Sequence, residues 1–197
     1  CQRVEDAGMQ DRIEIVKKDY RLLTGQYDKL VSIEMIEAVG LAYLGNYFEK
    51  CASLLKPTGK MLIQAITIAD QHYEFSKRNV DFIQRYIFPG GALPSVTALT
   101  NIATNETDLR MTALEDITGH YAATMRKWRE KFYLNVEQIT ELGYDNRFLR
   151  MWEACCHIAS RAPITPDTTT TTLRNPMQIL ARRLIAVWGF VWRTPII

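Results

Sequence analysis

The stretch Tyr27-Asp-Lys-Leu-Val-Ser-Ile-Glu-Met-Ile-Glu-Ala-Val-Gly40 decides the fold. Its first seven residues form a short, largely apolar run, which is typical of a buried strand. A second apolar run from Met61 to Ile68 is rich in β-branched residues and also predicts a strand. Between the two, apolar side chains recur every three or four residues from Tyr43 to Leu55, which predicts a helix. A strand, a helix and a strand with short connections indicate a parallel α/β sheet.

Two further segments predict strands on each side of this unit. Residues Arg12 to Asp19 alternate apolar and polar side chains and end in an acid. An acid at the end of a strand is typical of α/β sheets that hold a ribose or an adenine at their carboxyl edge. Residues Leu109 to Asp116 are the other candidate strand. The segment Lys56-Pro-Thr-Gly59 is expected to stop the central helix.

The second half of the chain is predicted to be mainly helical. Tyr121, Met125, Trp128 and Phe132 have the spacing of one helix face. The other expected elements are a helix over 73–86, a turn-rich loop over 88–94, and two short helices over 136–142 and 145–152 that Gly143 separates.

The composition is that of one globular domain. The chain has 197 residues, of which 47% are hydrophobic and 23% charged. The net charge of +2 excludes the strong positive field expected of a nucleic-acid-binding protein. The four cysteines show no repeated spacing, which excludes a disulfide scaffold and predicts the reduced thiols of an intracellular protein. The longest apolar run, Leu184 to Trp192, is much shorter than the about 20 residues of a membrane span.

The carboxyl-terminal segment differs in amino-acid composition from the rest. It contains five consecutive threonines, Thr168 to Thr172, so we expect a domain over 1–160 followed by a divergent low-complexity tail over 161–197. A frameshift or a wrongly assigned exon would produce such a tail. The alternative is an interfacial anchor formed by Trp188, Trp192 and the neighbouring arginines.

Three segments, in this order and spacing, resemble one enzyme family. They are the 27–40 stretch quoted above, Val80-Asp-Phe-Ile-Gln-Arg-Tyr-Ile-Phe-Pro-Gly-Gly-Ala-Leu-Pro-Ser95, and Gly119-His-Tyr-Ala-Ala-Thr-Met-Arg-Lys-Trp128 followed by Arg147-Phe-Leu-Arg-Met-Trp152. The family comprises the cyclopropane-fatty-acyl-phospholipid synthases and the mycolic acid cyclopropane synthases. The resemblance covers about Arg3 to Glu153.

The resemblance implies an α/β fold, namely a partial Rossmann-like S-adenosylmethionine methyltransferase with a family-specific helical insertion. No glycine-rich nucleotide loop follows a predicted strand, so the loop and the first strands are expected upstream of Cys1. The implied reaction transfers a methylene group from S-adenosylmethionine to the cis double bond of an unsaturated phospholipid acyl chain. The implied location is the cytoplasmic surface of a membrane. A homodimer is possible.

The resemblance also implies the catalytic residues. Family members hold a bicarbonate ion as the base, and the positions that hold it correspond here to Glu37, Tyr121, Gln64 and the backbone of Ile66. Most family members have a histidine where Gln64 stands. Because glutamine carries no charge and shuttles no proton, it is expected to hold the anion more weakly.

Four further residues correspond to the cofactor contacts of the family. Asp19 and Tyr20 match the segment that contacts the adenine of S-adenosylmethionine. Ser32 and Ile33 end the 27–33 strand, where the methionine part of the cofactor passes. No group of histidines has the spacing of metal ligands, so no metal is expected.

Each site residue also has a purely structural interpretation. Glu37 is then a solvated acid at a helix start, and Tyr121 is a core side chain on the helix face that it shares with Met125. Gln64 is then a hydrogen-bonded buried amide, and Asp19 a helix cap. At the level of function, the alternatives are a methyltransferase that acts on another lipid and an inactive fragment that binds a partner but no cofactor.

Overall fold

The structure is a computed structural model that describes the backbone of residues 2–160, 168–173 and 184–187. The α-helices are α1 (Gln2–Asp6), α2 (Leu44–Ser53), α3 (Asp70–Arg78), α4 (Phe82–Tyr86), α5 (Val96–Glu106), α6 (Thr118–Leu134), α7 (Val136–Glu141) and α8 (Asn146–Ser160). The 3₁₀ helices are η1 (Tyr20–Leu22), η2 (Ile36–Ala38) and η3 (Leu41–Tyr43). The strands are β1 (Tyr27–Ile33), β2 (Leu55–Ile68), β3 (Glu115–Asp116), β4 (Thr168–Leu173) and β5 (Leu184–Val187).

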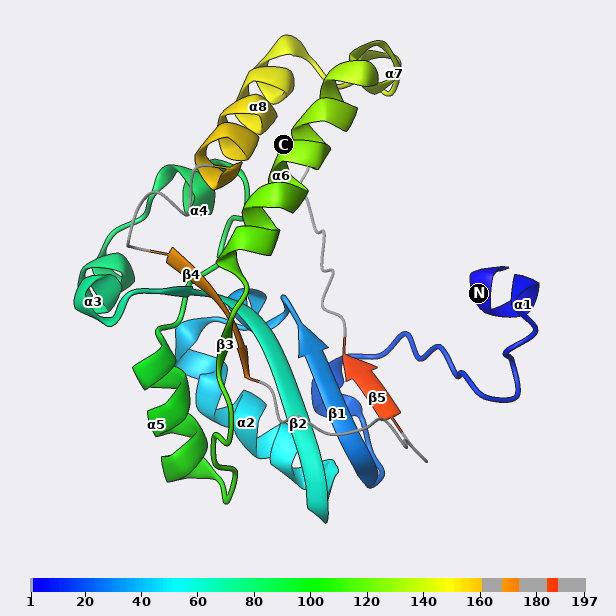
Figure 1. Ribbon diagram of the computed structural model, residues 1–197, viewed down its shortest axis with the longest axis vertical. Helices are drawn as coiled ribbons and strands as arrows, with labels where there is room; N and C mark the ends of the chain where they lie inside the picture. The colour runs from blue at the N-terminus through cyan, green and yellow to red at the C-terminus, as the bar shows by residue number, and fades with distance from the viewer. Residues whose placement is uncertain (1, 161–167, 174–183, 188–197) are drawn as a thin grey trace.

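The five strands form one sheet in the order β3-β4-β2-β1-β5 (Figure 1). Strands β1 and β2 are parallel, with Leu30 opposite Met61 and Ile33 opposite Gln64. Strand β5 is also parallel to β1, while β4 is antiparallel to both β2 and β3. The predicted strand, helix and parallel strand over 27–68 are therefore confirmed.

Strand β2 begins earlier than the sequence predicts. The segment 56–59 was expected to stop a helix, but α2 ends at Ser53 and the chain enters β2 at Leu55. The register jumps from the pair Tyr27–Leu55 to the pair Lys29–Lys60, so the extra residues, Pro57 among them, form a bulge. A Cβ atom on Gly59 would lie 2.9 Å from the carbonyl oxygen of Lys56, so this bulge requires glycine.

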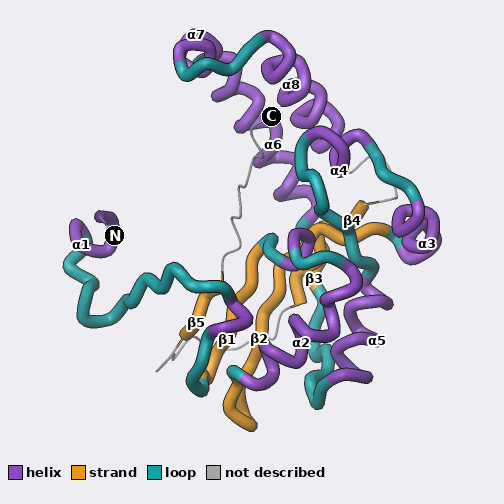
Figure 2. The backbone as a smooth tube through the Cα atoms, turned by 180° about the vertical axis from the view of Figure 1, so that it is seen from behind, coloured by secondary structure: helices purple, strands orange, loops and turns teal. Residues whose placement is uncertain are grey.

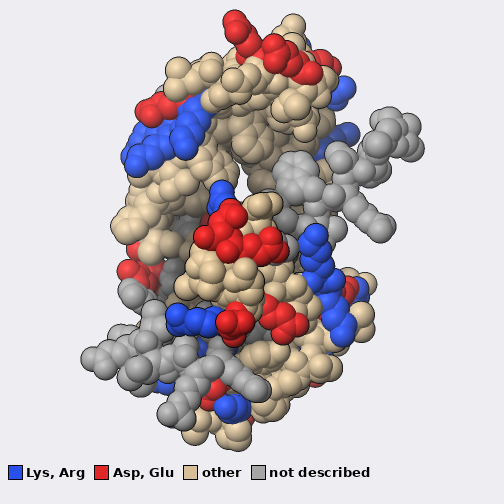
Figure 3. All heavy atoms as spheres, turned by 90° about the vertical axis from the view of Figure 1, so that its right-hand side faces the viewer, with Lys and Arg blue, Asp and Glu red and all other residues tan. Residues whose placement is uncertain are grey.

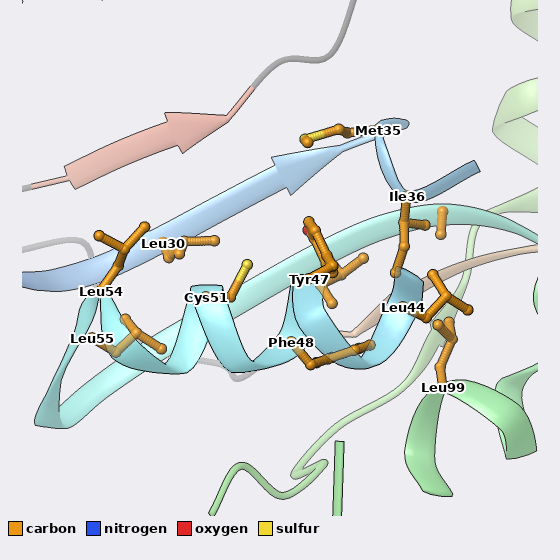
Figure 4. Close-up of a cluster of buried hydrophobic side chains, with 12 residues drawn as sticks. Leu30, Met35, Ile36, Leu44, Tyr47, Phe48, Cys51, Leu54, Leu55 and Leu99 are labelled. Atoms are coloured by element: carbon orange, nitrogen blue, oxygen red, sulfur yellow. The ribbon is translucent and has the colours of Figure 1, made fainter. Parts of the chain in front are cut away.

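Helices α2 and α5 cover one face of the sheet (Figure 2). Alternate residues of the strands point to this face, so Leu30, Ile63 and Ala65 are buried against α2. Helix α2 contributes Leu44, Tyr47, Phe48 and Cys51, which Figure 4 shows beneath the strands. This cluster is the hydrophobic core, and it fixes the ends of β1 and β2 next to each other.

Helices α6, α7 and α8 form an arm beyond the carboxyl ends of β1 and β2 (Figure 1). The predicted helix face of α6 is confirmed for Met125 and Phe132, which are buried, whereas Trp128 is exposed. The two short helices predicted after α6 are confirmed as α7 and α8, which the turn around Gly143 separates. The expected turn-rich loop over 88–94 is also present.

The predicted strand over 12–19 is wrong. This segment has no strand hydrogen bonds, and Ile13, Ile15 and Val16 on it are exposed. A strand needs a hydrogen-bonded neighbour, and among the described residues β2 and β5 occupy the two edges of β1. Alternation of apolar and polar residues alone therefore does not make this segment a strand, because the segment pairs with no edge of the sheet.

Three other segments differ from the sequence expectation. Over 109–116, only Glu115 and Asp116 are in a strand. The helix expected over 73–86 is split into α3 and α4, because Asp81 and Gln84 form a capping box that starts a new helix. Helix α5 had no predicted counterpart, and Ser95 caps its amino terminus by accepting a hydrogen bond from the Ala98 backbone.

Part of the expected low-complexity tail forms strands. The threonine run lies in β4, which agrees with the preference of β-branched residues for strands. The interfacial anchor concerns Trp188 and Trp192, which lie outside the described residues, and the frameshift interpretation stays a prediction. Among the described helices, none is long and apolar enough to cross a membrane. Acidic and basic side chains occur in separate small groups on the face in Figure 3.

The core position of Leu30 gives a test of this fold. Leu30 has no exposed surface, whereas Leu134 at the end of α6 is 83% exposed. We expect Leu30→Ala to lower the free energy of unfolding by about 3 kcal/mol, because it leaves a cavity under the sheet. Urea unfolding measures the change, and Leu134→Ala is the matched control with an expected change below about 0.5 kcal/mol. Equal effects of the two substitutions would contradict the described packing.

Candidate functional site

The site is formed where β2 continues past the end of β1. Strand β1 ends at Ile33, but β2 runs on to Ile68. Beyond this point β2 still pairs with β4 on one side, but its backbone groups on the β1 side bond to other partners. The Gln64 carbonyl accepts from the Glu34 backbone at 2.9 Å, and the Ile68 N–H donates to the Pro94 carbonyl at 3.0 Å. Between them, the Ile66 N–H donates to the side chain of Glu37.

The side chain of Glu37 thus accepts the hydrogen bond that a backbone carbonyl of β1 would accept if β1 extended further. The Ile66 nitrogen lies 2.5 Å from Glu37 Oε1. Glu37 lies in η2, which follows β1 directly, and the buried side chain of Ile36 anchors this short helix in the core. The Glu37 carbonyl accepts from the Ala92 backbone at 2.9 Å, so the loop over 88–94 fixes the residue from the other side.

Burial controls the ionisation of Glu37. Desolvation and, to a smaller extent, the negative charge of Glu34 raise its pKa to about 7, although the hydrogen bond from the Ile66 backbone opposes this rise. The second oxygen, Oε2, is buried and has no hydrogen-bond partner among the described residues. A buried carboxyl oxygen without a hydrogen-bond partner costs free energy.

Gln64 lies on the sheet face opposite α2 and contacts Glu34. Its Nε2 donates to Glu34 Oε1 at 3.0 Å. Glu34 has a φ of 46°, in the left-handed region that residues with a side chain rarely adopt. This conformation turns the chain sharply at the end of β1, and the side chain then reaches across to β2.

Tyr121 reaches the same site from the first turns of α6. Burial raises the pKa of its hydroxyl, and the charges of Glu34, Cys155 and Glu37 raise it further. Its hydroxyl group therefore stays protonated and able to donate at physiological pH. Cys155 and Cys156 are buried in α8, which packs against α6, so the arm holds Tyr121 in place.

Of the four residues predicted to be catalytic, two bond directly to each other and a third bonds to the neighbouring Glu34. Glu37 bonds to Ile66, and Gln64 bonds to the intervening Glu34. Tyr121 lies near enough to both carboxylates for their charges to affect its pKa. The catalytic roles of all four stay predictions.

The predicted cofactor residues Asp19 and Tyr20 have structural contacts of their own. Asp19 is exposed, caps η1 and forms an ion pair with Arg21 at 2.6 Å. Its hydrogen bonds with Arg21 lower its pKa to about 2. Tyr20 packs its ring edge-on against Tyr47, with 5.6 Å between the ring centroids. Asp19 therefore fits the cap interpretation, and its cofactor contact stays a prediction.

The other predicted cofactor residues end β1. Ser32 is fully buried on the α2 side of the sheet, so it offers no surface to a ligand in this structure. Ile33 is half-buried and leads directly into Glu34. A ligand at the carboxyl edge of the sheet would therefore meet the turn around Ile33 and Glu34, which is where open α/β sheets bind their ligands. Among the described residues, no group of three or more His, Cys, Asp or Glu could hold a metal ion.

Sequence reasoning missed Glu34 and Tyr47. Glu34 stands immediately after the predicted strand β1, and a polar residue at the carboxyl end of a buried parallel strand is the signal that points to it. Tyr47 belongs to the apolar face of α2, so its pattern indicates only core. In the structure Tyr47 contacts Tyr20, and the charge of Glu37 affects its pKa. Tyr47 therefore connects the segment around Asp19 with Glu37.

Residues 1–162 match the family described as mycolic acid cyclopropane synthetase. The chain belongs to this family. Tuberculostearic acid methyltransferase UfaA1 of Mycobacterium tuberculosis is 44% identical over 152 residues, which cover 77% of this chain and 36% of the relative. Cyclopropane-fatty-acyl-phospholipid synthase of Escherichia coli K12 is 34% identical over 71% of this chain and 35% of the relative. The chain thus spans about a third of the length of these curated family members.

A solved structure of the family has the same fold. The crystal structure of mycolic acid cyclopropane synthase CmaA1 with SAH and CTAB matches with a TM-score of 0.60 and 22% identity, over 79% of this chain and 58% of that one. The predicted partial Rossmann-like methyltransferase fold is therefore confirmed, with β1 and β2 as its parallel strands.

The ionisation of Glu37 predicts a pH dependence of stability. The folded chain keeps the Glu37 proton up to about pH 7, whereas the unfolded chain loses it near pH 4.3. Stability linked to this proton is complete below about pH 4 and is lost as the pH rises through 7. Glu37→Gln keeps a hydrogen-bond acceptor for Ile66 but carries no charge. The free energy of unfolding of Glu37→Gln minus that of the wild type should therefore be about 3 kcal/mol larger at pH 8 than at pH 4.

Urea unfolding at the two pH values measures this difference. Glu49→Gln is the matched control, because Glu49 lies on the exposed surface of α2. The control should shift the free energy of unfolding equally at both pH values. A Glu37→Gln effect that does not change with pH would show that Glu37 is ionised in the folded chain.

Proposed function

We propose that the protein carrying this chain transfers a methylene group from S-adenosylmethionine to the cis double bond of a phospholipid acyl chain, forming a cyclopropane fatty acid. The observation that carries the proposal is the cluster at the carboxyl end of β1 and β2. There, Glu37, Gln64, Ile66 and Tyr121 lie together, as the family resemblance implies. Membership of the mycolic acid cyclopropane synthetase family supports it.

The residues of this chain supply the surroundings of the reaction. S-adenosylmethionine supplies an electrophilic methyl group on a positively charged sulfur, and it would lie over Ile33 at the carboxyl edge of the sheet. Negative charge on the nearby carboxylates suits a positively charged reagent. Tyr121, near the start of α6, holds a protonated hydroxyl group beside them, and α8 packs against α6. Shielding from water is required because a carbocation at the acyl chain would otherwise react with it.

The lipid substrate places the protein at a membrane surface. We propose a peripheral location on the cytoplasmic side, with the acyl chain reaching the site from the bilayer.

A second candidate is methylation of a lipid without ring closure. It is favoured by Gln64, which stands where most family members have a histidine, and by the 44% identity with a protein named tuberculostearic acid methyltransferase. The two candidates share the methyl transfer and differ in the fate of the proton that is lost. An inactive fragment, the remaining alternative, would bind no S-adenosylmethionine.

Bicarbonate, the base that the resemblance implies, fits the described residues poorly. Of the three donors expected to hold it, two are engaged by carboxylates of the chain itself, and only the Tyr121 hydroxyl group donates to no carboxylate among the described residues. The Ile66 N–H donates to Glu37, and the Gln64 amide donates to Glu34. A second anion would also lie beside the charge of Glu34, which already raises the pKa of Glu37.

The binding test uses calorimetry with S-adenosylmethionine on the 197-residue chain and on the chain extended upstream along its gene. We expect binding to the extended protein, because the glycine-rich loop of the resemblance is not among the residues of this chain. Methyl-labelled S-adenosylmethionine and unsaturated phospholipid vesicles then test transfer. Proton NMR of the product lipid separates cyclopropane ring protons from those of a methyl or methylene branch. Failure of the extended protein to bind or to transfer would contradict the proposal.

Tyr121→Phe tests whether the cluster is the active site. Phenylalanine keeps the ring packing in α6 and removes only the hydroxyl group. We expect the rate of transfer to fall at least about 10-fold, with the unfolding midpoint nearly unchanged. Tyr43→Phe is the matched control, because Tyr43 is 63% exposed on η3. A Tyr121→Phe protein as active as the control would remove Tyr121 from the site.

A further inference from the structure

Glu34 is the one residue of the cluster to which the family resemblance assigns no role, yet it is attached to Gln64 at two points. Its backbone N–H donates to the Gln64 carbonyl at 2.9 Å, and its Oε1 accepts from Gln64 Nε2 at 3.0 Å. This double attachment fixes both the direction of the carboxylate and that of the amide. A glutamine held in this way presents its N–H to a carboxylate of the chain and not to a bound anion.

The backbone of Glu34 is strained. Its φ of 46° lies in the left-handed region, and Glu34 is the only residue other than glycine with a positive φ among the described residues. Such conformations cost free energy and occur mainly where the surrounding structure enforces them, often at functional sites. Here the pairing with Gln64 and the start of η2 enforce the turn, and the turn carries the carboxylate to the open edge of the sheet.

Glu34 is the exposed negatively charged group of the cluster. Its negative charge is among the causes that raise the pKa values of Glu37 and Tyr121, so it lies close to both groups. Among the described residues, no lysine or arginine forms an ion pair with Glu34 or Glu37. A positively charged reaction centre would therefore meet a carboxylate that has no competing cation.

Glu37 is less suited to receive a proton from a substrate. Its Oε1 is held by the Ile66 N–H, and its Oε2 is buried. Its pKa of about 7 leaves it largely protonated on the acid side of neutral pH. Glu34, in contrast, is exposed at the carboxyl end of β1, where a substrate can reach it.

We propose that the Glu34 carboxylate, held by Gln64, takes the place of a bound anion and accepts the proton that the acyl chain loses. This inference rests on the proposed function. The alkene π electrons form the new bond to the methyl carbon, and the sulfur keeps the electrons of its broken bond and leaves as a neutral thioether. Glu34 then takes a proton from the transferred methyl group, and the electrons of that C–H bond close the ring. If Glu34 takes the proton from a neighbouring carbon of the acyl chain, the electrons of that C–H bond form a double bond, and the product is an unsaturated branched chain.

The test measures transfer by the extended protein in carbon-dioxide-free buffer with and without added bicarbonate. We expect the wild-type rate to be the same in both. Glu34→Gly should fold, because glycine adopts a φ of 46° without strain. It should lose at least about 100-fold in rate without bicarbonate. Added bicarbonate should restore part of that rate, because the space and the Gln64 amide become free. The Glu49→Gln control should behave as the wild type.

The outcomes separate this inference from the proposed function. A wild-type rate that falls in the absence of bicarbonate and returns on its addition overturns the role of Glu34 alone. So does a Glu34→Gly protein with the wild-type rate. Absence of transfer at every bicarbonate concentration overturns the proposed function and this inference with it. Titration with ¹³C-labelled bicarbonate gives a readout that needs no activity: we expect saturable binding to Glu34→Gly and none to the wild type.

Discussion

The site depends on one geometric constraint, the difference in length between two parallel strands. Because β2 extends past β1, those of its backbone N–H and C=O groups that face the β1 side need other partners from Gln64 onward, while β4 pairs with the opposite side. An unpaired backbone group away from water costs as much as a lost hydrogen bond, so the chain must supply those partners. It supplies the Glu34 backbone, the Glu37 side chain and the Pro94 carbonyl. The residues predicted to be catalytic thus also complete the hydrogen bonding at this end of the sheet.

The hydrogen bond that Glu37 supplies to the β2 backbone explains why a carboxyl group is buried here. The bond from Ile66 compensates part of the desolvation of Glu37, but the raised pKa shows that burial dominates. The remaining cost is tolerable because a single domain needs only a small net free energy of folding and the core under α2 is well packed. The ionised form of Glu37 is therefore the costly one, and an uncharged glutamine at this position should stabilise the fold above about pH 7.

The sequence predicts best those elements whose pattern and partners are both local. Strand β1 and helix α2 bury continuous apolar side chains against each other, and the predicted and observed bounds agree closely. The segment over 12–19 has an equally clear pattern but no neighbouring strand among the described residues. Whether a segment finds a strand to pair with depends on the tertiary structure, which the local pattern does not contain. Helix α5 was missed because its threonine-rich sequence has a weak apolar face, although Ser95 after Pro94 is a capping signal.

The same distinction applies to the site. The resemblance identifies Glu37, Gln64, Ile66 and Tyr121, but it does not reveal that the polar groups of three of them already have partners in the chain. That knowledge needs the register of β1 on β2, which places Ile33 opposite Gln64 and hence Glu34 beside its side chain. Glutamine carries no charge, so Gln64 places no positive charge beside Glu34. Among the described residues, no lysine or arginine forms an ion pair with Glu34 either, so its carboxylate is held by an amide hydrogen bond and not by a cation. The neutral side chain at position 64 and the carboxylate at position 34 therefore act together: they fix a negative charge at the end of β1 without neutralising it.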